Sequence, residues 1–187
     1  YQDYEFRGFR VPLKEAGERA VEALDIIETG LSGATLDYKG RHHSVSGVGL
    51  AVRPANARPV TYLAGAMNHP TLPRRAVRKG YVPFVYNGWA PFSAVESMRA
   101  AYDKTAREEG VDPASIGMAL ERFVYVADTK DEALWAAEQF RYTARAARSL
   151  RFDYVQLDGT TIRDLPAKDE PDLETIIREG VIGDAET

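Results

Sequence analysis

The residues best suited to chemistry lie in two short segments, each of which follows an apolar run. The first is Ala64-Gly65-Ala66-Met67-Asn68-His69, which has small side chains and leads into a stretch with helical spacing. Small residues let backbone N–H groups approach an anion, and the amino end of a helix favours negative charge. The segment therefore predicts a phosphate-binding turn, with a plain strand-to-helix connection as the alternative.

The second segment, Asn87-Gly88-Trp89-Ala90-Pro91-Phe92, carries two aromatic planes. Trp89 and Phe92 suit contact with an aromatic ligand, since ligand pockets are lined mainly by apolar and aromatic side chains. In the alternative interpretation, the two rings cover the rim of the fold without touching a ligand. The residue types alone leave both interpretations open.

Other kinds of chemistry have little support in the sequence. The chain has no Cys and three His, so disulfides and thiolate sites are excluded and we expect no metal site. No G-x-S-x-G, Walker or G-x-G-x-x-G pattern occurs. Arg141, Arg145 and Arg148 share part of one predicted helix surface, which we interpret as a solvated face.

The composition of the chain argues against two classes of partner, nucleic acids and membranes. The 187 residues carry 24 Lys plus Arg against 28 Asp plus Glu, and the formal charge of −4 argues against nucleic acid. The apolar runs are far shorter than the roughly 20 residues that span a bilayer, so we expect no membrane insertion. With 44% hydrophobic residues, the chain has the balance of a globular domain, and we expect 1–187 to form a single domain.

The spacing of apolar residues predicts strands that alternate with helices, and hence an α/β fold with a parallel sheet. Residues 34–59 lack a helical period and predict a hairpin excursion. Ser93 with Glu96, and Thr129 with Glu132, have the form of capping boxes that open helices. The predicted strands are 60–64, 81–86 and 120–127, and the predicted helices are 15–29, 71–79, 93–109, 129–150 and 173–179.

Five segments together resemble the bacterial-luciferase-like flavin-dependent monooxygenases. They occur in the order in which that family has them, and the resemblance covers the whole chain. One of them, Arg58 to Gly65, is similar to the family's segment in which prolines precede an apolar strand and a glycine. The five segments are Glu5–Pro12, Arg58–Gly65, Ala76–Gly80, Phe123–Thr129 and Val181–Glu186.

The resemblance implies a partial (β/α)₈ TIM barrel that binds reduced flavin at the carboxyl ends of its strands. The early strands would then lie before Tyr1 and the last strand after Thr187. In the family, reduced FMN activates O₂ to oxygenate a small organic substrate, and a deazaflavin-dependent hydride transfer is the alternative. The resemblance also implies a flavin reductase or other flavin supply, a homodimer and a cytoplasmic location.

By the same resemblance, Ala64, Gly65, Ala66 and Met67 would hold the flavin phosphate through backbone N–H groups, and Arg19 would add a guanidinium contact. Asn87 and Trp89 would face the flavin ring or the substrate. No catalytic residue can be assigned. Gly65-Ala66 replaces the Ser or Glu-Ser of many members, which removes side-chain contacts to the phosphate. A non-catalytic flavin-binding relative is therefore a further alternative.

Overall fold

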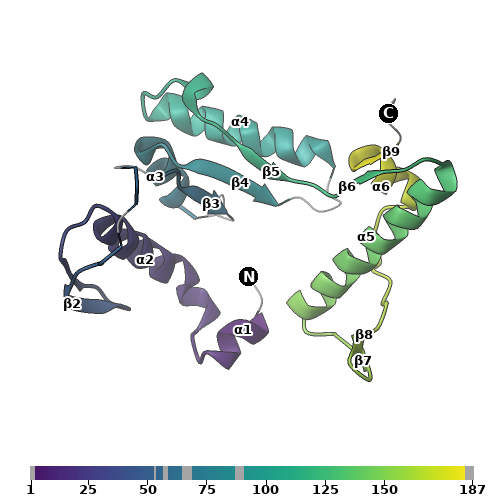
Figure 1. Cartoon of the computed structure of the whole chain (residues 1–187), viewed down its shortest axis with the longest axis horizontal. Helices are drawn as coiled ribbons and strands as arrows, with labels where there is room; N and C mark the ends of the chain where they lie inside the picture. The colour runs from purple at the N-terminus through teal and green to yellow at the C-terminus, as the bar shows by residue number, and fades with distance from the viewer. Residues whose placement is uncertain (1–2, 53, 57–58, 65–68, 87–90, 184–187) are drawn as a thin grey trace.

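The computed structural model describes residues 3–52, 54–56, 59–64, 69–86 and 91–183 (Figure 1). Helices and strands alternate along most of this part of the chain, as the apolar spacing predicted. The helices are α1 (Asp3–Gly8), α2 (Ala16–Leu31), α3 (Leu72–Lys79), α4 (Phe92–Glu108), α5 (Lys130–Arg151) and α6 (Leu173–Glu179). The strands are β1 (Leu36–Lys39), β2 (Ser44–Val48), β3 (Tyr62–Ala64), β4 (Val82–Tyr86), β5 (Ala119–Glu121), β6 (Val124–Val126), β7 (Leu157–Asp158), β8 (Thr161–Ile162) and β9 (Val181–Gly183).

Parallel strands form the two sheets that position the candidate site. In the first sheet the order is β3-β4-β5, with Ala64 aligned to Phe84 and Phe84 aligned to Ala119. Two residues after β5, β6 begins and pairs in parallel with β9, where Val126 lies opposite Gly183. The other strands form antiparallel hairpins, β1-β2 and β7-β8. The first of these confirms the predicted excursion within residues 34–59.

Helices cover one face of the parallel sheets (Figure 1). Leu63 of β3 packs against a core that α3 and α4 share, and Ile182 of β9 belongs to a second core with α5 and α6. The first core contains Ala76, Val77, Tyr81, Tyr102, Ala106 and Ile116, and the second contains Ala127, Ala133, Ala136, Ala137, Ile176 and Ile182. Each helix pair therefore attaches to its own sheet through a small apolar cluster.

The opposite face of these strands is apolar and open. Side chains alternate between the two faces of a strand, so the neighbours of the packed residues point away from the helices. Tyr62 of β3 is 60% exposed, and Val124 and Val126 of β6 are 62% and 72% exposed. Because parallel sheets are normally covered on both faces, the exposed apolar residues of each sheet are suited to contact with a ligand or with further polypeptide.

Two features of the predicted strands and helices were wrong. The predicted strand 120–127 is two strands, β5 and β6, and Val124 and Val126 of β6 are exposed. Ser93 does not cap a helix, because α4 begins at Phe92 and its N-cap residue Pro91 offers no side-chain hydrogen bond. The Thr129 cap is confirmed, since its hydroxyl oxygen accepts from the Glu132 N–H at 3.2 Å.

Sequence spacing also missed β9 and did not show which apolar residues of α2 are buried. β9 has three residues, too few for a periodic signal, and it is recognised as a strand through its pairing with β6. In α2, Ala16 and Gly30 are buried but Ile27 is 52% exposed. The helix thus lies on the fold with a partly exposed apolar stripe rather than a fully buried one.

Arg145 corrects the expectation of a solvated arginine face on α5. The residue is 6% exposed, and its Nη1 donates to Asp164 Oδ2 at 2.8 Å while its Nε donates to Glu170 Oε2 at 2.7 Å. The guanidinium lowers the pKa of the Glu170 carboxyl from 4.5 to about 2, against the opposing effect of burial. These contacts hold the segment between α5 and α6 against α5.

Replacement of Arg145 by Met should destabilise the fold by roughly 3 kcal/mol, because two carboxylates then lose their buried partner. A depressed carboxyl pKa stabilises the folded state above the unfolded pKa. The contribution of Glu170 should therefore be complete above about pH 4.5 and decline as the pH falls toward 2. Urea unfolding at pH 3 and pH 7 measures both effects.

Arg151→Met is the matched control, since Arg151 is exposed at the end of the same helix. Glu170→Gln should flatten the pH dependence between those two values. Equal stability of Arg145→Met and Arg151→Met would contradict the assignment.

Candidate functional site

The predicted phosphate segment begins at the carboxyl end of β3. Ala64 is the last residue of that strand and is exposed on its open face. Gly65, Ala66 and Met67 lie outside the described residues, as do Asn87 and Trp89. The site is therefore built from the residues that flank these positions on α2, α3, α4 and β6.

His69 caps the amino end of α3. Its Nδ1 accepts from the Thr71 N–H at 3.2 Å and from the Leu72 N–H at 3.3 Å, and Thr71 Oγ1 lies 3.1 Å away. The two backbone N–H groups at the start of α3 thus share one side-chain acceptor. The sequence had placed His69 at the end of the predicted phosphate segment and given it no role.

The same ring lies directly on α2. A Cβ built on Gly17 would stand 2.6 Å from His69 Cδ2 and 2.8 Å from Nε2, which is closer than real contacts allow. Only glycine therefore lets α2 approach the ring in this way. His69 joins the end of the β3 segment to two helices at once.

The His69 cap reduces the number of N–H groups that the amino end of α3 can offer to an anion. Thr71 and Leu72 direct their N–H groups to His69, and Pro73 has no N–H to offer. The sequence had assigned part of the anion affinity of this turn to the helix end. Most of the first-turn donors of α3 are instead satisfied within the protein.

Phe92, one of the two predicted aromatic planes, stands at the amino end of α4. Its N–H donates to Glu179 Oε2 at 3.0 Å, and the Arg122 guanidinium carbon lies 4.6 Å from its ring centroid. A cation over an aromatic face is attracted by the ring quadrupole. Phe92 therefore packs against a charged residue of the β5-β6 connection, while half of its surface stays exposed.

A cavity of about 370 Å³ opens where β6 and β9 end, the side of a parallel sheet where ligands bind in α/β folds. The Lys130–Glu174 ion pair at 3.0 Å lies on its wall. Beside it, Glu132 accepts from the Asp128 N–H and from the Tyr125 hydroxyl, both at 2.8 Å. The Asp128 N–H and the Tyr125 hydroxyl stabilise the Glu132 carboxylate and lower its pKa. The same two hydrogen bonds connect the end of β6 to the first turn of α5.

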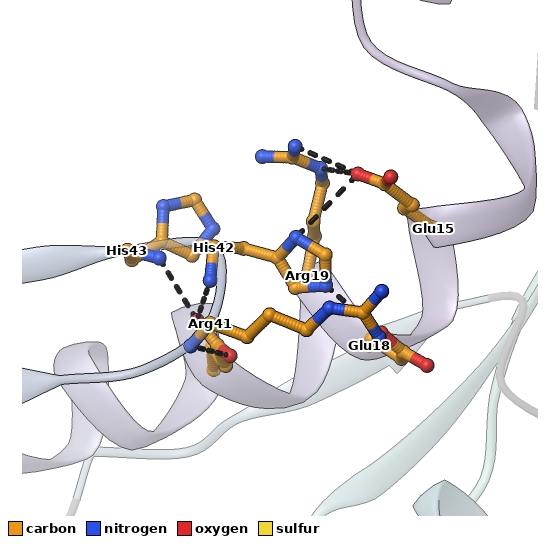
Figure 2. Close-up of polar contacts among 7 residues, drawn as sticks. Glu15, Glu18, Arg19, Arg41, His42 and His43 are labelled. Atoms are coloured by element: carbon orange, nitrogen blue, oxygen red, sulfur yellow. Dashed lines mark hydrogen bonds and ion pairs between the residues drawn. The ribbon is translucent and has the colours of Figure 1, made fainter.

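Arg19, the predicted guanidinium contact, lies on α2 in a cluster of charged residues (Figure 2). Its Nε and Nη2 donate to Glu15 Oε2 at 3.1 and 2.8 Å. In the same cluster His42 lies between two carboxylates, with Nδ1 3.4 Å from Glu15 and Nε2 2.9 Å from Glu18. The cluster joins α2 to the β1-β2 hairpin.

Glu22 anchors the turn of that hairpin. Its carboxylate accepts from the backbone N–H groups of Arg41, His42 and His43 at 2.7, 3.0 and 2.9 Å. Burial alone would raise the pKa of Glu22, but the three N–H donors outweigh it and the pKa is lowered. Gly40 also permits this approach, because a Cβ there would stand 2.3 Å from the Glu22 carboxylate.

Neither a metal-binding cluster nor a membrane-spanning helix is found among the described residues. Among the described residues, no cluster of three or more His, Asp and Glu is placed to hold a metal ion. In the same part of the chain, no helix combines the length and apolar character needed to cross a membrane.

Replacement of Glu22 by Ala should release the hairpin turn, since three backbone donors lose a charged acceptor at once. We expect amide hydrogen exchange at positions 41–43 to accelerate by roughly tenfold. Glu121→Ala, an exposed carboxylate on β5, is the control and should leave these amides unchanged. Slow exchange retained in Glu22→Ala would show that the turn does not depend on this carboxylate.

The whole chain matches the family model of luciferase-like monooxygenases, over residues 1–187. A protein of Sinorhizobium fredii (strain NBRC 101917 / NGR234), described as uncharacterized protein y4vJ, is 25% identical over 185 residues. That alignment covers 98% of this chain and 52% of the relative. The chain thus spans about half the length of the curated relative it matches.

Two solved structures share the fold. Monooxygenase RslO1 from Streptomyces bottropensis is 20% identical with a TM-score of 0.68, over 82% of this chain and 47% of that one. Riboflavin lyase (RcaE), solved with modified FMN and its substrate riboflavin, is 17% identical with a TM-score of 0.55, over 78% and 38%. The predicted α/β class and partial TIM-barrel fold are confirmed. The chain belongs to the luciferase-like monooxygenase family.

Proposed function

We propose that this chain contributes to a flavin-dependent monooxygenase that uses reduced FMN and O₂ to oxygenate a small organic substrate. The observation that carries the proposal is the family match over residues 1–187, together with an open apolar sheet face beside the carboxyl ends of the strands. RcaE, a structural neighbour, was solved with modified FMN, which supports FMN over a deazaflavin.

The described residues fit the ring of a flavin. Val124 and Val126 of β6 are exposed apolar side chains, and apolar side chains are the usual lining of a site for a planar aromatic ring. A bound reduced flavin supplies the electrons that activate O₂, and the protein supplies position and a dry environment. In this proposal the exposed valines exclude water from one side of the ring, and Asn87 and Trp89 contact the ring or the substrate.

The phosphate contacts of the proposal lie at the end of β3. The backbone N–H groups of Gly65, Ala66 and Met67 follow directly after Ala64 and are the proposed donors. Arg19 adds a charged contact in the proposal. A guanidinium has five N–H donors, and Glu15 engages Nε and Nη2, so Nη1 can serve the phosphate.

The proposal also covers the domain organisation, the location, the assembly and the flavin supply of the full protein. Residues 1–187 form one domain, an arc of a (β/α)₈ barrel. The full protein acts in the cytoplasm as a homodimer and receives reduced flavin from a reductase. The resemblance to the family supports these parts of the proposal, and they do not rest on contacts in the described residues.

Flavin titration of the purified full-length protein tests the function. We expect FMN to bind, and the protein with reduced FMN and O₂ to convert a small organic substrate. If the protein binds a deazaflavin more tightly than FMN, the result would favour the alternative function, hydride transfer, over oxygenation with O₂. Binding of FMN without turnover of any substrate would support a non-catalytic relative, and failure to bind any flavin would refute the proposal.

Val126→Lys tests separately whether the exposed apolar side of β6 contacts the flavin. A charged side chain on the open face should weaken FMN binding by roughly tenfold, because burying an ammonium against the ring is unfavourable. Val52→Lys is the matched control, since Val52 is also largely exposed but lies after β2. Fluorescence quenching of FMN measures both variants. Equal affinities would exclude this face as a wall of the flavin site.

A further inference from the structure

We propose that a cavity at the amino ends of β3 and β4 binds a small organic monocarboxylate with an apolar body. The cavity has a volume of about 710 Å³, and the residues that line it all belong to the described part of the chain. It lies where β3 and β4 begin, whereas the proposed flavin site lies where the strands end. The inference therefore goes beyond the proposed function and does not depend on flavin binding.

Two helix ends and two strand starts form this cavity. α2 ends at Leu31 and α3 ends at Lys79, and both of these residues belong to the lining. Gly80 caps α3 with a φ of +70°, which lets the chain turn from the helix toward β4. The Val82 N–H donates to the Thr61 carbonyl oxygen at 2.8 Å and joins the two strand starts. Backbone contacts therefore fix the sides of the cavity that α3, β3 and β4 form.

One part of the lining is apolar. It consists of Leu31, Pro59, Val60, Tyr81 and Val82. The Val60 side chain is 68% exposed, although it lies only two residues before β3. Removal of apolar surface from water is favourable, and ligand pockets of this size are lined mainly by such side chains. This wall predicts a ligand with an apolar body.

The charged part of the lining carries more positive than negative charge. The side chains of Arg78 and Lys79 are 65% and 55% exposed, and Glu28 is the one carboxylate among these described lining residues. Glu28 already pairs with Arg75 at 2.6 Å and with Lys79 at 3.1 Å. Glu109, the partner of Arg78, lies outside the lining. A ligand with one negative charge would therefore balance the second cation of the cavity.

A carboxylate suits these two cations in geometry as well as in charge. A guanidinium presents paired N–H donors that match the two oxygens of a carboxylate, and an ammonium adds a compact charge. Among the described contacts, Arg78 pairs with Glu109 through Nε. Because the cations and the apolar wall belong to one cavity, one molecule should carry both the carboxylate and the apolar body.

Naphthoate and naphthalenemethanol test the class of ligand, because they share a ring system and differ in charge. In the full-length protein, naphthoate should bind roughly tenfold more tightly than naphthalenemethanol. Naphthoate should also shift the amide NMR signals of Thr61, Gly80 and Val82, which border the cavity.

Four outcomes of these titrations would overturn the inference. Equal affinities for the two compounds would exclude a role for the cations. Inorganic phosphate that binds as tightly as naphthoate would exclude a role for the apolar wall. Naphthoate that binds without shifting the three amides would exclude the cavity as the site, and no binding of naphthoate would refute the proposal as a whole.

Lys79→Met should weaken naphthoate binding by roughly tenfold and change naphthalenemethanol binding by less than about twofold. The fold should tolerate this change, because Lys79 is half exposed and Glu28 keeps Arg75 as a partner. Arg107→Met is the matched control, since Arg107 is exposed in the last turn of α4 and lies outside the lining. Equal losses of naphthoate affinity in the two variants would contradict the assignment.

Discussion

In the described strands β3, β6 and β9, one face packs under helices and side chains on the other face are exposed. Leu63 and Ile182 enter cores beneath α3–α4 and α5–α6, while Tyr62, Val124 and Val126 remain open on the other side. Apolar surface of this kind favours removal from water. These exposed side chains lie on the same strands whose carboxyl ends we propose to border the flavin site.

With small apolar cores, much of the arrangement depends on charged contacts between elements. Arg75 of α3 pairs with Asp25 and Glu28 of α2 at 2.7 and 2.6 Å. Glu22 holds the hairpin turn through backbone N–H groups, and Arg145 holds the segment before α6. Most of these contacts join elements far apart in sequence, so they fix how the helices and the hairpin sit on the sheets rather than the elements themselves.

At the amino end of α3, contacts within the protein determine which N–H groups are available to bind an anion. A free helix end next to a small-residue segment favours an anion. Here the donors of Thr71 and Leu72 are committed to His69, and Pro73 contributes none. The amino end of α3 therefore offers few free N–H donors, and the proposed phosphate contact would depend on other groups. Among the described contacts, Arg19 pairs with one carboxylate, Glu15, whereas two carboxylates hold the Arg145 guanidinium.

The sequence by itself determined the α/β class, the hairpin, the helix starting after Thr129 and the family, because apolar spacing, turn residues and ordered motifs are local properties. Tertiary structure decided which apolar residues are covered, as Val126 and Ile27 show. It also placed Arg145 in a buried pair and His69 between two helices. Neither could be predicted, since burial and hydrogen-bond partners depend on residues brought together only by folding: Arg145 meets Glu170 across 25 positions, and His69 meets Gly17 from a separate element.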